Sequence, residues 1–161
     1  MSNTHLNNGV GKQKSILFLS HYFPPEVNAP ANRTFEHCRQ WAKNEDISIT
    51  VVTNFPNHPD GKILGNYKNR LKAEEEIEGI RVVRLLTIIT ANEGLLLRTF
   101  NYVFFMIVSI LFVLLSRRKY DIVIATSPQF FCGIAGAIIS KVKRIPLILE
   151  VRDLWPESIV A

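Results

Sequence analysis

Short apolar runs alternate along the chain with longer stretches in which apolar residues recur every three or four positions. Five runs are rich in Ile, Val and Leu with little polar alternation, namely Ile16–Ser20, Ile47–Thr53, Arg81–Leu86, Ile122–Ala125 and Pro146–Val151. Strands buried on both faces of a sheet have this composition, and strands that alternate with helices form parallel sheets. The pattern therefore predicts an α/β fold, a Rossmann-like parallel sheet with helices on both faces.

Two amphipathic helices and a hairpin are expected between these strands. One helix has Pro30 in its first turn and a face made of Ala31, Thr34, Phe35, Cys38, Trp41 and Ala42. The other, Gln129–Lys141, carries small residues that allow close packing on the sheet. Arg70–Glu76, followed by Glu78 and Gly79, is expected to pair with the third strand as a hairpin.

Between the third and fourth strands lies a helix of unusual composition, Thr99–Ser116, which contains no charged residue. On length alone it is a candidate transmembrane helix. A span would split the sheet across the bilayer, because the crossover between two parallel strands must return on the same side. We therefore expect the helix to lie flat on an anionic membrane surface. Burial against another domain and a true span stay open as alternatives.

Both sides of this helix are apolar. The side expected to face the sheet holds Leu96, Phe100, Val103, Phe104, Ile107, Leu111 and Leu114. The opposite side, with Met106 and Val113, and the bracketing cations supply the expected membrane contacts, namely Arg98, Phe105, Phe112, Arg117, Arg118 and Lys119.

Composition narrows the class of protein. Of 161 residues, 47% are apolar and 20% charged, which suits a folded domain and excludes a disordered tail. The formal net charge is +5, but the basic residues are scattered apart from the cluster after the apolar helix, which favours a membrane surface over nucleic acid. The two cysteines, Cys38 and Cys132, have no zinc-type spacing, so no metal site is expected. Residues 1–14 lack a secretory-signal pattern and are expected to be a disordered lead-in.

Ligands of open parallel sheets bind beyond the carboxyl ends of the strands. The polar residues that follow the strands are therefore the candidate site residues: His21, Glu26, Asn28, Arg33, Asn54, Ser127, Pro128, Arg152, Asp153, Trp155 and Glu157. Structural roles stay open for several of them, as ion pairs between Glu26 and Arg33 and between Arg152 and Asp153, or as a loop histidine at His21. No Gly-x-Gly-x-x-Gly follows the first strand, so a dinucleotide cradle is not expected.

Five segments carry, in order, a resemblance to a known family. They are Ser20–Glu26 with Arg33, Val51–Pro59, Glu78–Arg84, Asp121–Pro128 and Glu150–Ser158. Together they resemble the amino-terminal half of family 4, GT-B-type glycosyltransferases, and within it the bacterial polysaccharide-building enzymes similar to fucosamine transferases. The likeness covers residues 15–161.

The resemblance implies that residues 15–161 form a truncated, Rossmann-like acceptor-binding domain, the incomplete amino-terminal half of a GT-B fold. The donor-binding second domain of that fold is expected to be missing from this sequence. Its E-x7-E motif does not occur here, because Glu150 and Glu157 are one residue too close. The resemblance also implies retention of anomeric configuration with no cofactor and no metal, the nucleotide-sugar being a co-substrate. We expect a fragment or half of a split enzyme that is inactive alone.

The resemblance also implies residue roles by position. Three residues would lie opposite the donor phosphates: Glu26, Asn28 and Arg33. Three more would line the cleft: Asn54, Ser127 and Pro128. Arg152 and Asp153 occupy the slot where many relatives have a His-Asp pair, and are the candidate catalytic residues. Two departures stand out, since Asn28-Ala29 replaces paired glycines and Arg152 replaces the histidine.

The function implied is the acceptor-binding part of a retaining glycosyltransferase that moves a sugar to a lipid-linked or glycan acceptor in polysaccharide biosynthesis. The expected partners are a nucleotide-sugar, that acceptor, an anionic membrane surface and a separate donor-binding chain, but no nucleic acid. The expected location is cytoplasmic, peripheral on the inner face of the cell membrane. The alternative is a non-catalytic membrane-docking subunit of a split glycosyltransferase.

Overall fold

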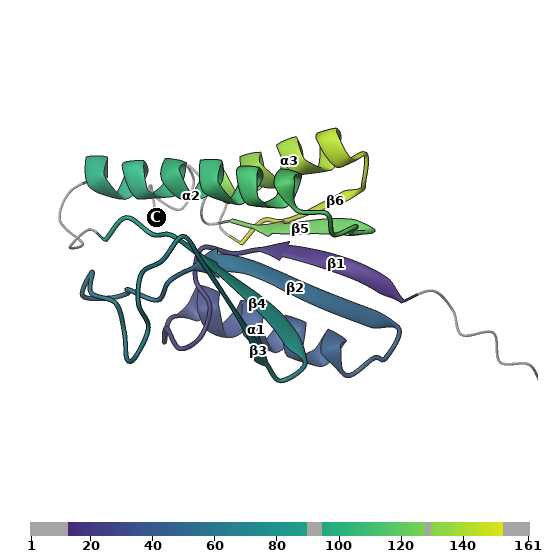
Figure 1. Ribbon diagram of the computed structural model, residues 1–161, viewed down its shortest axis with the longest axis horizontal. Coiled ribbons are helices and arrows are strands. Elements are labelled where there is room, and N and C mark those ends of the chain that lie inside the picture. Colours follow the sequence, from purple (N-terminus) through teal and green to yellow (C-terminus); the bar gives the residue numbers. More distant parts are fainter. Residues whose placement is uncertain (1–12, 90–94, 128–129, 153–161) are drawn as a thin grey trace, which may run out of the picture.

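A computed structural model describes residues 13–89, 95–127 and 130–152. These residues form a six-stranded sheet in the order β3-β4-β2-β1-β5-β6. The strands are β1 (Lys14–Leu19), β2 (Ile47–Asn54), β3 (Lys72–Ile77), β4 (Ile80–Leu85), β5 (Ile122–Thr126) and β6 (Leu147–Glu150). The helices are α1 (Ala29–Ala42), α2 (Leu95–Leu115) and α3 (Phe130–Lys143). The predicted Rossmann-like α/β fold is confirmed, with α1 on one face of the sheet and α2 and α3 on the other (Figure 1).

The five predicted apolar runs are all strands, with ends that differ from the prediction by at most two residues. β1 lies at the centre and pairs in parallel with β2 and β5, while β4 and β6 extend the sheet in parallel on either side. Successive side chains of these strands enter opposite cores: Leu17 packs on the α2–α3 side and Phe18 on the α1 side. Burial on both faces explains the weak polar alternation that marked these segments.

The expected hairpin is also confirmed, because β3 pairs antiparallel with β4. Glu78 and Gly79 connect the two strands with positive φ values of 48° and 77°, as a tight two-residue turn requires. β3 forms one edge of the sheet, and its exposed side chains are all charged: Lys72, Glu74 and Glu76. Such an edge resists pairing with other strands.

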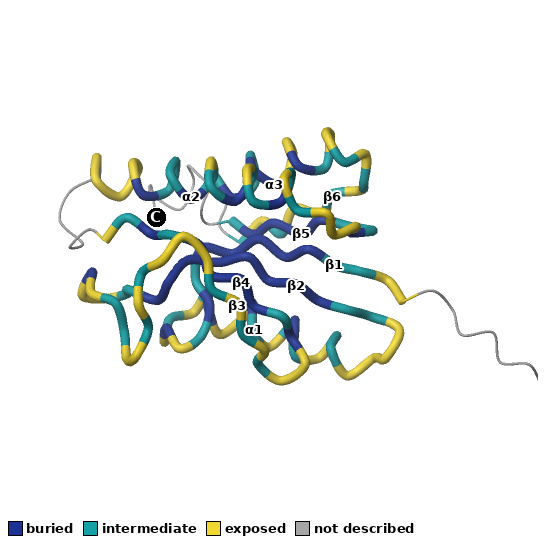
Figure 2. Tube along the Cα trace, viewed as in Figure 1, coloured by how far each residue is buried: buried dark blue, intermediate teal, exposed yellow. Residues whose placement is uncertain are grey.

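The predicted orientation of α2 is wrong. Four side chains of the face expected on the sheet are exposed instead: Leu96, Phe100, Ile107 and Leu111. The buried stripe consists of residues spaced four apart, namely Asn101, Phe105, Ser109 and Val113. The prediction placed the more apolar side in the core, but the side with the polar Asn101 and Ser109 packs there (Figure 2).

Two predicted lipid contacts are corrected by this orientation. Phe105 is only 1% exposed, and its ring packs against that of His21. Phe112 is half-buried on the core, with its ring 5.7 Å from the Lys72 ammonium. The four cations predicted to bracket the helix, Arg98, Arg117, Arg118 and Lys119, are exposed as expected.

The length and composition of α2 also fit a membrane-spanning helix. Leu96–Leu115 is long and apolar enough to cross a membrane, with a mean hydropathy of 2.0. The helix nevertheless packs against α3 and supplies Val113 to the core beneath. It therefore covers one face of the sheet.

Close packing of α3 on the sheet yields a test of the fold. A Cβ at Gly136 would lie 2.8 Å from the Ala125 Cβ and 3.0 Å from the Leu147 Cδ1. Overpacking of a core costs about 1–3 kcal/mol, and the gain in helix propensity returns about 1 kcal/mol. We expect Gly136→Ala to lower the free energy of unfolding by about 1 kcal/mol, measured by urea denaturation with circular dichroism.

Gly133 on the same helix is the matched control. A Cβ there would meet the Leu149 Cδ1 at 3.1 Å, the tip of a half-exposed side chain that can move. Gly133→Ala should leave the free energy of unfolding unchanged or raise it by up to about 1 kcal/mol. Equal effects of the two substitutions would contradict the close packing of α3 described above.

Candidate functional site

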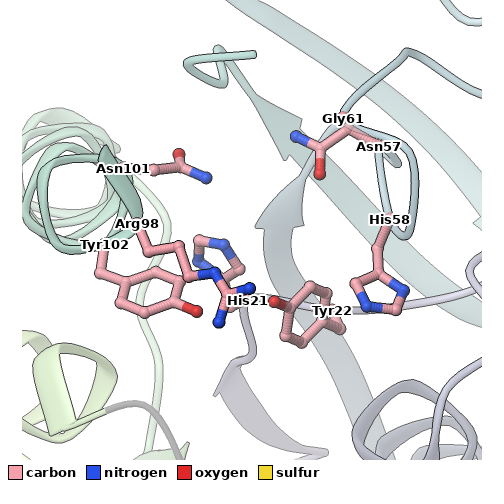
Figure 3. A pocket seen from close by; sticks show the side chains of 8 residues that line it. All are labelled: His21, Tyr22, Asn57, His58, Gly61, Arg98, Asn101 and Tyr102. Atoms are coloured by element: carbon pink, nitrogen blue, oxygen red, sulfur yellow. The ribbon is translucent and has the colours of Figure 1, made fainter. Parts of the chain in front are cut away.

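A small polar pocket lies at the carboxyl edge of the sheet, beside the amino-terminal part of α2. Its volume is about 20 Å³, which is room for one water-sized group. Three segments line it, the turn after β1, the loop after β2 and α2, through His21, Tyr22, Asn57, His58, Gly61, Arg98, Asn101 and Tyr102 (Figure 3). The lining therefore combines two phenols, two amides, two imidazoles and a guanidinium.

His21 forms the floor of this pocket and is 4% exposed. Its ring makes edge contacts with Tyr22, Tyr102 and Phe105, at centroid distances of 4.9, 5.0 and 5.2 Å. The Asn54 side-chain amide donates to the imidazole, 2.9 Å from Nδ1. Burial lowers the pKa of His21 to about 3, so the ring is neutral and accepts this hydrogen bond.

Tyr22 and His58 form the side of the pocket that faces α2. Their rings meet at a centroid distance of 5.5 Å. Burial raises the pKa of Tyr22, and the neighbouring Tyr102 and Glu26 raise it further, although Arg98 acts in the opposite direction. The phenol therefore stays protonated near neutral pH and can donate a hydrogen bond.

Two polar atoms in the pocket lining lack a partner among the described residues. They are Nδ1 of His58 and Oδ1 of Asn101, and both are buried. Asn101 is only 7% exposed although its side chain is a polar amide on a mostly apolar helix. Buried polar groups are almost always hydrogen-bonded to protein, water or ligand. These two atoms mark the pocket as a place where a water molecule or a ligand hydroxyl would be held.

Glu26 holds the pocket walls together from behind and does not line the pocket. Its Oε1 accepts from the backbone N–H groups of Asn57 and His58, both at 3.0 Å, and its Oε2 accepts from Phe23 N–H at 3.3 Å. The carboxylate is 2% exposed, and this burial raises its pKa although the three N–H groups act in the opposite direction. The ion pair with Arg33, which the sequence left open as a structural alternative, does not form among the described residues, and Arg33 lies exposed on α1.

Arg84 holds the same loops as Glu26 but with the opposite charge, and it was not predicted from the sequence. Although it lies on β4, it is 1% exposed and donates to the carbonyl oxygens of Pro24 and Asn54. It also pairs with Glu75 of β3 and lies 4.7 Å from the centre of the Tyr67 ring. Its signal in the sequence was an arginine within an apolar strand that is buried on both faces.

A second polar cluster lies beyond β5 and β6 and contains Arg152. The Arg152 guanidinium, 6% exposed, donates to Pro30 O, to Thr34 Oγ1 and to Glu150, and its backbone N–H donates to Ser127 Oγ at 3.0 Å. Arg152 therefore clamps the end of β6 to the start of α1. Its predicted partner Asp153 lies outside the described residues, as do Pro128, Trp155 and Glu157.

The two clusters meet at one edge of the sheet, as predicted. Thr34 Oγ1, which accepts a hydrogen bond from Arg152, lies 3.3 Å from Ser20 Oγ. Ser20 Oγ in turn donates to Tyr22 O at 2.7 Å. Of the predicted site residues, His21 lines the pocket and Asn54 supports it. Asn28 caps α1, its Oδ1 accepting from Ala31 N–H at 2.8 Å, so this oxygen is committed to the helix.

Seven of the eight pocket residues were not predicted as ligand-binding residues. Tyr22 lies in the turn after β1, three residues lie in the loop after β2, and the other three lie on α2. Asn101 and Tyr102 belong to the uncharged run Thr99–Ser116 and were given no role, and Arg98 was predicted to contact the membrane. The available signal was Asn101, an amide in the middle of an apolar helix. In the part of the chain that is described, no three His, Cys, Asp or Glu side chains lie close enough to hold a metal ion.

The comparisons with known proteins bear on the fold alone. No protein-family model matches the chain, and no curated protein matches it. Among solved structures, the chain is similar to the carboxyl-terminal domain of a hydrogenase from Pyrococcus furiosus, with 15% sequence identity and a TM-score of 0.54. The match covers 86% of this chain and 92% of that domain. At this identity the likeness shows a shared α/β fold alone, and the resemblance to glycosyltransferases stays a prediction.

The buried neutral His21 predicts a dependence of stability on pH. Between pH 6.5 and about 3 the unfolded chain binds a proton at this residue and the folded chain does not. The free energy of unfolding should therefore fall as the pH decreases through this window, by up to about 1.4 kcal/mol per pH unit from this residue alone. Urea denaturation at pH values from about 7 down to about 4.5, spaced by about half a unit, measures this dependence.

The control is His21→Gln, which keeps a hydrogen-bond acceptor for Asn54 and removes the titrating ring. Glu26 acts with the opposite sign, because a raised carboxyl pKa gives stability that is lost as the pH rises. Both proteins share Glu26, so the difference between their profiles isolates His21. Parallel profiles would show that folding does not lower the pKa of His21.

Proposed function

We propose that the chain is the acceptor-binding part of a retaining glycosyltransferase, which moves a sugar from a nucleotide-sugar to a glycan acceptor in polysaccharide biosynthesis. Three things support the proposal. The five resembling segments occur in the family's order, the fold is the α/β fold that the family implies, and a polar pocket lies at the carboxyl edge of the sheet, where such folds bind ligands.

The pocket is the observation that carries the proposal. Phenols, amides and neutral imidazoles donate and accept hydrogen bonds without a net charge, which suits the hydroxyl groups of a sugar. Asn101 and His58 lie on opposite sides of the pocket (Figure 3), and each has a polar atom without a partner among the described residues that would bind a hydroxyl. A volume of about 20 Å³ admits one such group, so the pocket would hold a single acceptor hydroxyl and leave the rest of the glycan outside.

The chemistry that these residues would supply is positioning. His21 is buried, and its lowered pKa makes it a poor proton acceptor at neutral pH, so it would orient the pocket and not act as a base. Holding an acceptor hydroxyl in one orientation removes much of the entropic cost of a two-substrate reaction. Arg152, proposed with Asp153 for the catalytic slot, has its guanidinium bonded to protein atoms and would position the end of β6.

The donor nucleotide-sugar would be bound elsewhere, on a second domain or a separate chain. The proposed place of work is the cytoplasmic face of the cell membrane, with a lipid-linked acceptor. A second candidate function is a non-catalytic subunit that docks such an enzyme on the membrane. The observation that favours it is the exposed apolar side of α2, which no other described element covers.

Glycan binding tests the pocket. The purified chain is titrated with a mixture of short soluble oligosaccharides, and binding is followed by saturation-transfer NMR. Asn101→Leu fills the pocket and removes a hydrogen-bonding amide, and should weaken binding about tenfold or more. Asn32→Leu is the matched control, since Asn32 is exposed on α1.

The outcome is informative only for folded variants, which circular dichroism establishes. Equal weakening by both substitutions, or no binding by the unmodified chain, would contradict acceptor binding at the pocket. The proposal also expects no sugar transfer by the 161-residue chain on its own. Measurable transfer from a nucleotide-sugar would show that the donor site is contained within it.

A further inference from the structure

The outward side of α2 is more apolar than the side that packs on the sheet. Its outward apolar side chains are at least 47% exposed, namely Leu96, Leu97, Phe100, Ile107, Leu111 and Leu115. The other exposed residues described on α2, Arg98 and Thr99, lie in its first turn. The buried stripe, in contrast, contains Asn101 and Ser109. A helix that only covered a core would show the reverse distribution. The sequence of α2 therefore satisfies a second apolar environment in addition to the core.

α3 continues this surface. It packs against α2 on the same face of the sheet (Figure 1). Its own exposed large apolar side chains are Phe130, Ile138 and Val142. Nine of the fifteen exposed large apolar side chains among the described residues lie on these two helices. We call the outward side of the two helices the outer α2–α3 face.

The charged residues that α2 and α3 carry are all basic. Neither α2 nor α3 contains an acidic residue. The cations in and directly after the two helices are Arg98, Arg117, Arg118, Lys119, Lys141, Lys143 and Arg144. On the opposite face of the sheet, α1 and the turn after it mix both signs, with Glu36, Glu45 and Asp46 beside Arg39 and Lys43. The outer α2–α3 face is thus apolar, and the charged residues that the two helices and the turns directly after them supply are all basic. The acidic residue beside α2 is Glu74 of β3, which pairs with Lys72 and Arg81.

We propose that the outer α2–α3 face is a docking surface for an anionic membrane. An apolar strip with cations at its ends matches a bilayer surface, where acyl chains lie beneath a layer of negative headgroups. A helix of 21 residues is about 31 Å long and would lie in the plane of the membrane. It would not span the bilayer, because Phe105 and Val113 hold its other side in the protein core.

Docking in this way would bring the polar pocket close to the membrane. Arg98, Asn101 and Tyr102 line the pocket from the same helix whose outward side chains would enter the lipid. A helix with its side chains is about 10–12 Å wide, so the pocket would lie about one helix width from the headgroups. A polar group carried on a membrane lipid could therefore reach it. This consequence rests on the proposed function, whereas the docking itself does not.

Vesicle flotation of the full chain tests the surface. The probes are vesicles of phosphatidylcholine alone and vesicles with roughly one third phosphatidylglycerol. Binding to the anionic vesicles is expected, with a decrease at about 0.5 M salt, where exposed charges are screened. Arg117→Gln with Arg118→Gln should lower the partition coefficient on anionic vesicles about 30-fold, as two basic residues contribute at such a surface. Ile107→Gln with Leu111→Gln should lower it about tenfold or more.

The matched control is Arg39→Gln with Lys43→Gln, which removes two charges from the opposite face and should leave vesicle binding unchanged. Four results would overturn the proposal. They are no binding of folded chain to anionic vesicles, equal loss in the two charge variants, a stable dimer that forms through this face in place of vesicle binding, and resistance of the cellular protein to an alkaline carbonate wash, which indicates a span. Glycan binding measured without vesicles is a separate readout, so failure of docking and failure of acceptor binding are distinguishable.

Discussion

Two buried charges of opposite sign hold the loops from which the polar pocket is built. Arg84 donates to carbonyl oxygens in the loop after β1 and at the end of β2, and Glu26 accepts from backbone N–H groups in the loops after the same two strands. Loops outside a sheet have no ladder to satisfy their peptide groups. A buried charged group is costly unless all of its hydrogen bonds are formed. Glu26 and Arg84 therefore each favour the loop conformation that supplies their backbone partners. The positions of Tyr22 and His58 in the pocket follow from that conformation.

α2 links this pocket to the outer surface of the molecule. Its inward side carries the amide of Asn101 to the pocket and Phe105 to the ring of His21. Its outward side carries large apolar side chains, between cations at either end of the helix. A soluble helix has one apolar stripe, whereas α2 has two, and the less apolar of them faces the protein. The proposed membrane contact and the proposed acceptor pocket are therefore opposite sides of one helix.

Much of the fold was predictable because its cause is local. β1, β2, β4 and β5 are apolar in consecutive residues, and this pattern follows from burial between two layers of helices. The charged hairpin strand was predictable from the Glu78–Gly79 turn that precedes β4. The edge at which the polar residues gather also followed, since parallel strands end on the same side. The orientation of α2 was not predictable from hydrophobicity, because both of its sides are apolar. The prediction placed the more apolar side in the core, whereas the structure has the less apolar side there.

The sequence by itself determined the order of the elements, the class of the fold and the edge where a site would lie, because these depend on periodicity and on chain direction. Only the tertiary structure decided which polar residues line a pocket and which support it. Glu26 and Arg152 follow strands just as His21 does. Their charged side chains are nevertheless hydrogen-bonded to other protein atoms, whereas His21 forms the floor of the pocket. Hydrogen-bond partners of this kind come from segments tens of residues away, and their arrangement depends on packing that no local pattern encodes.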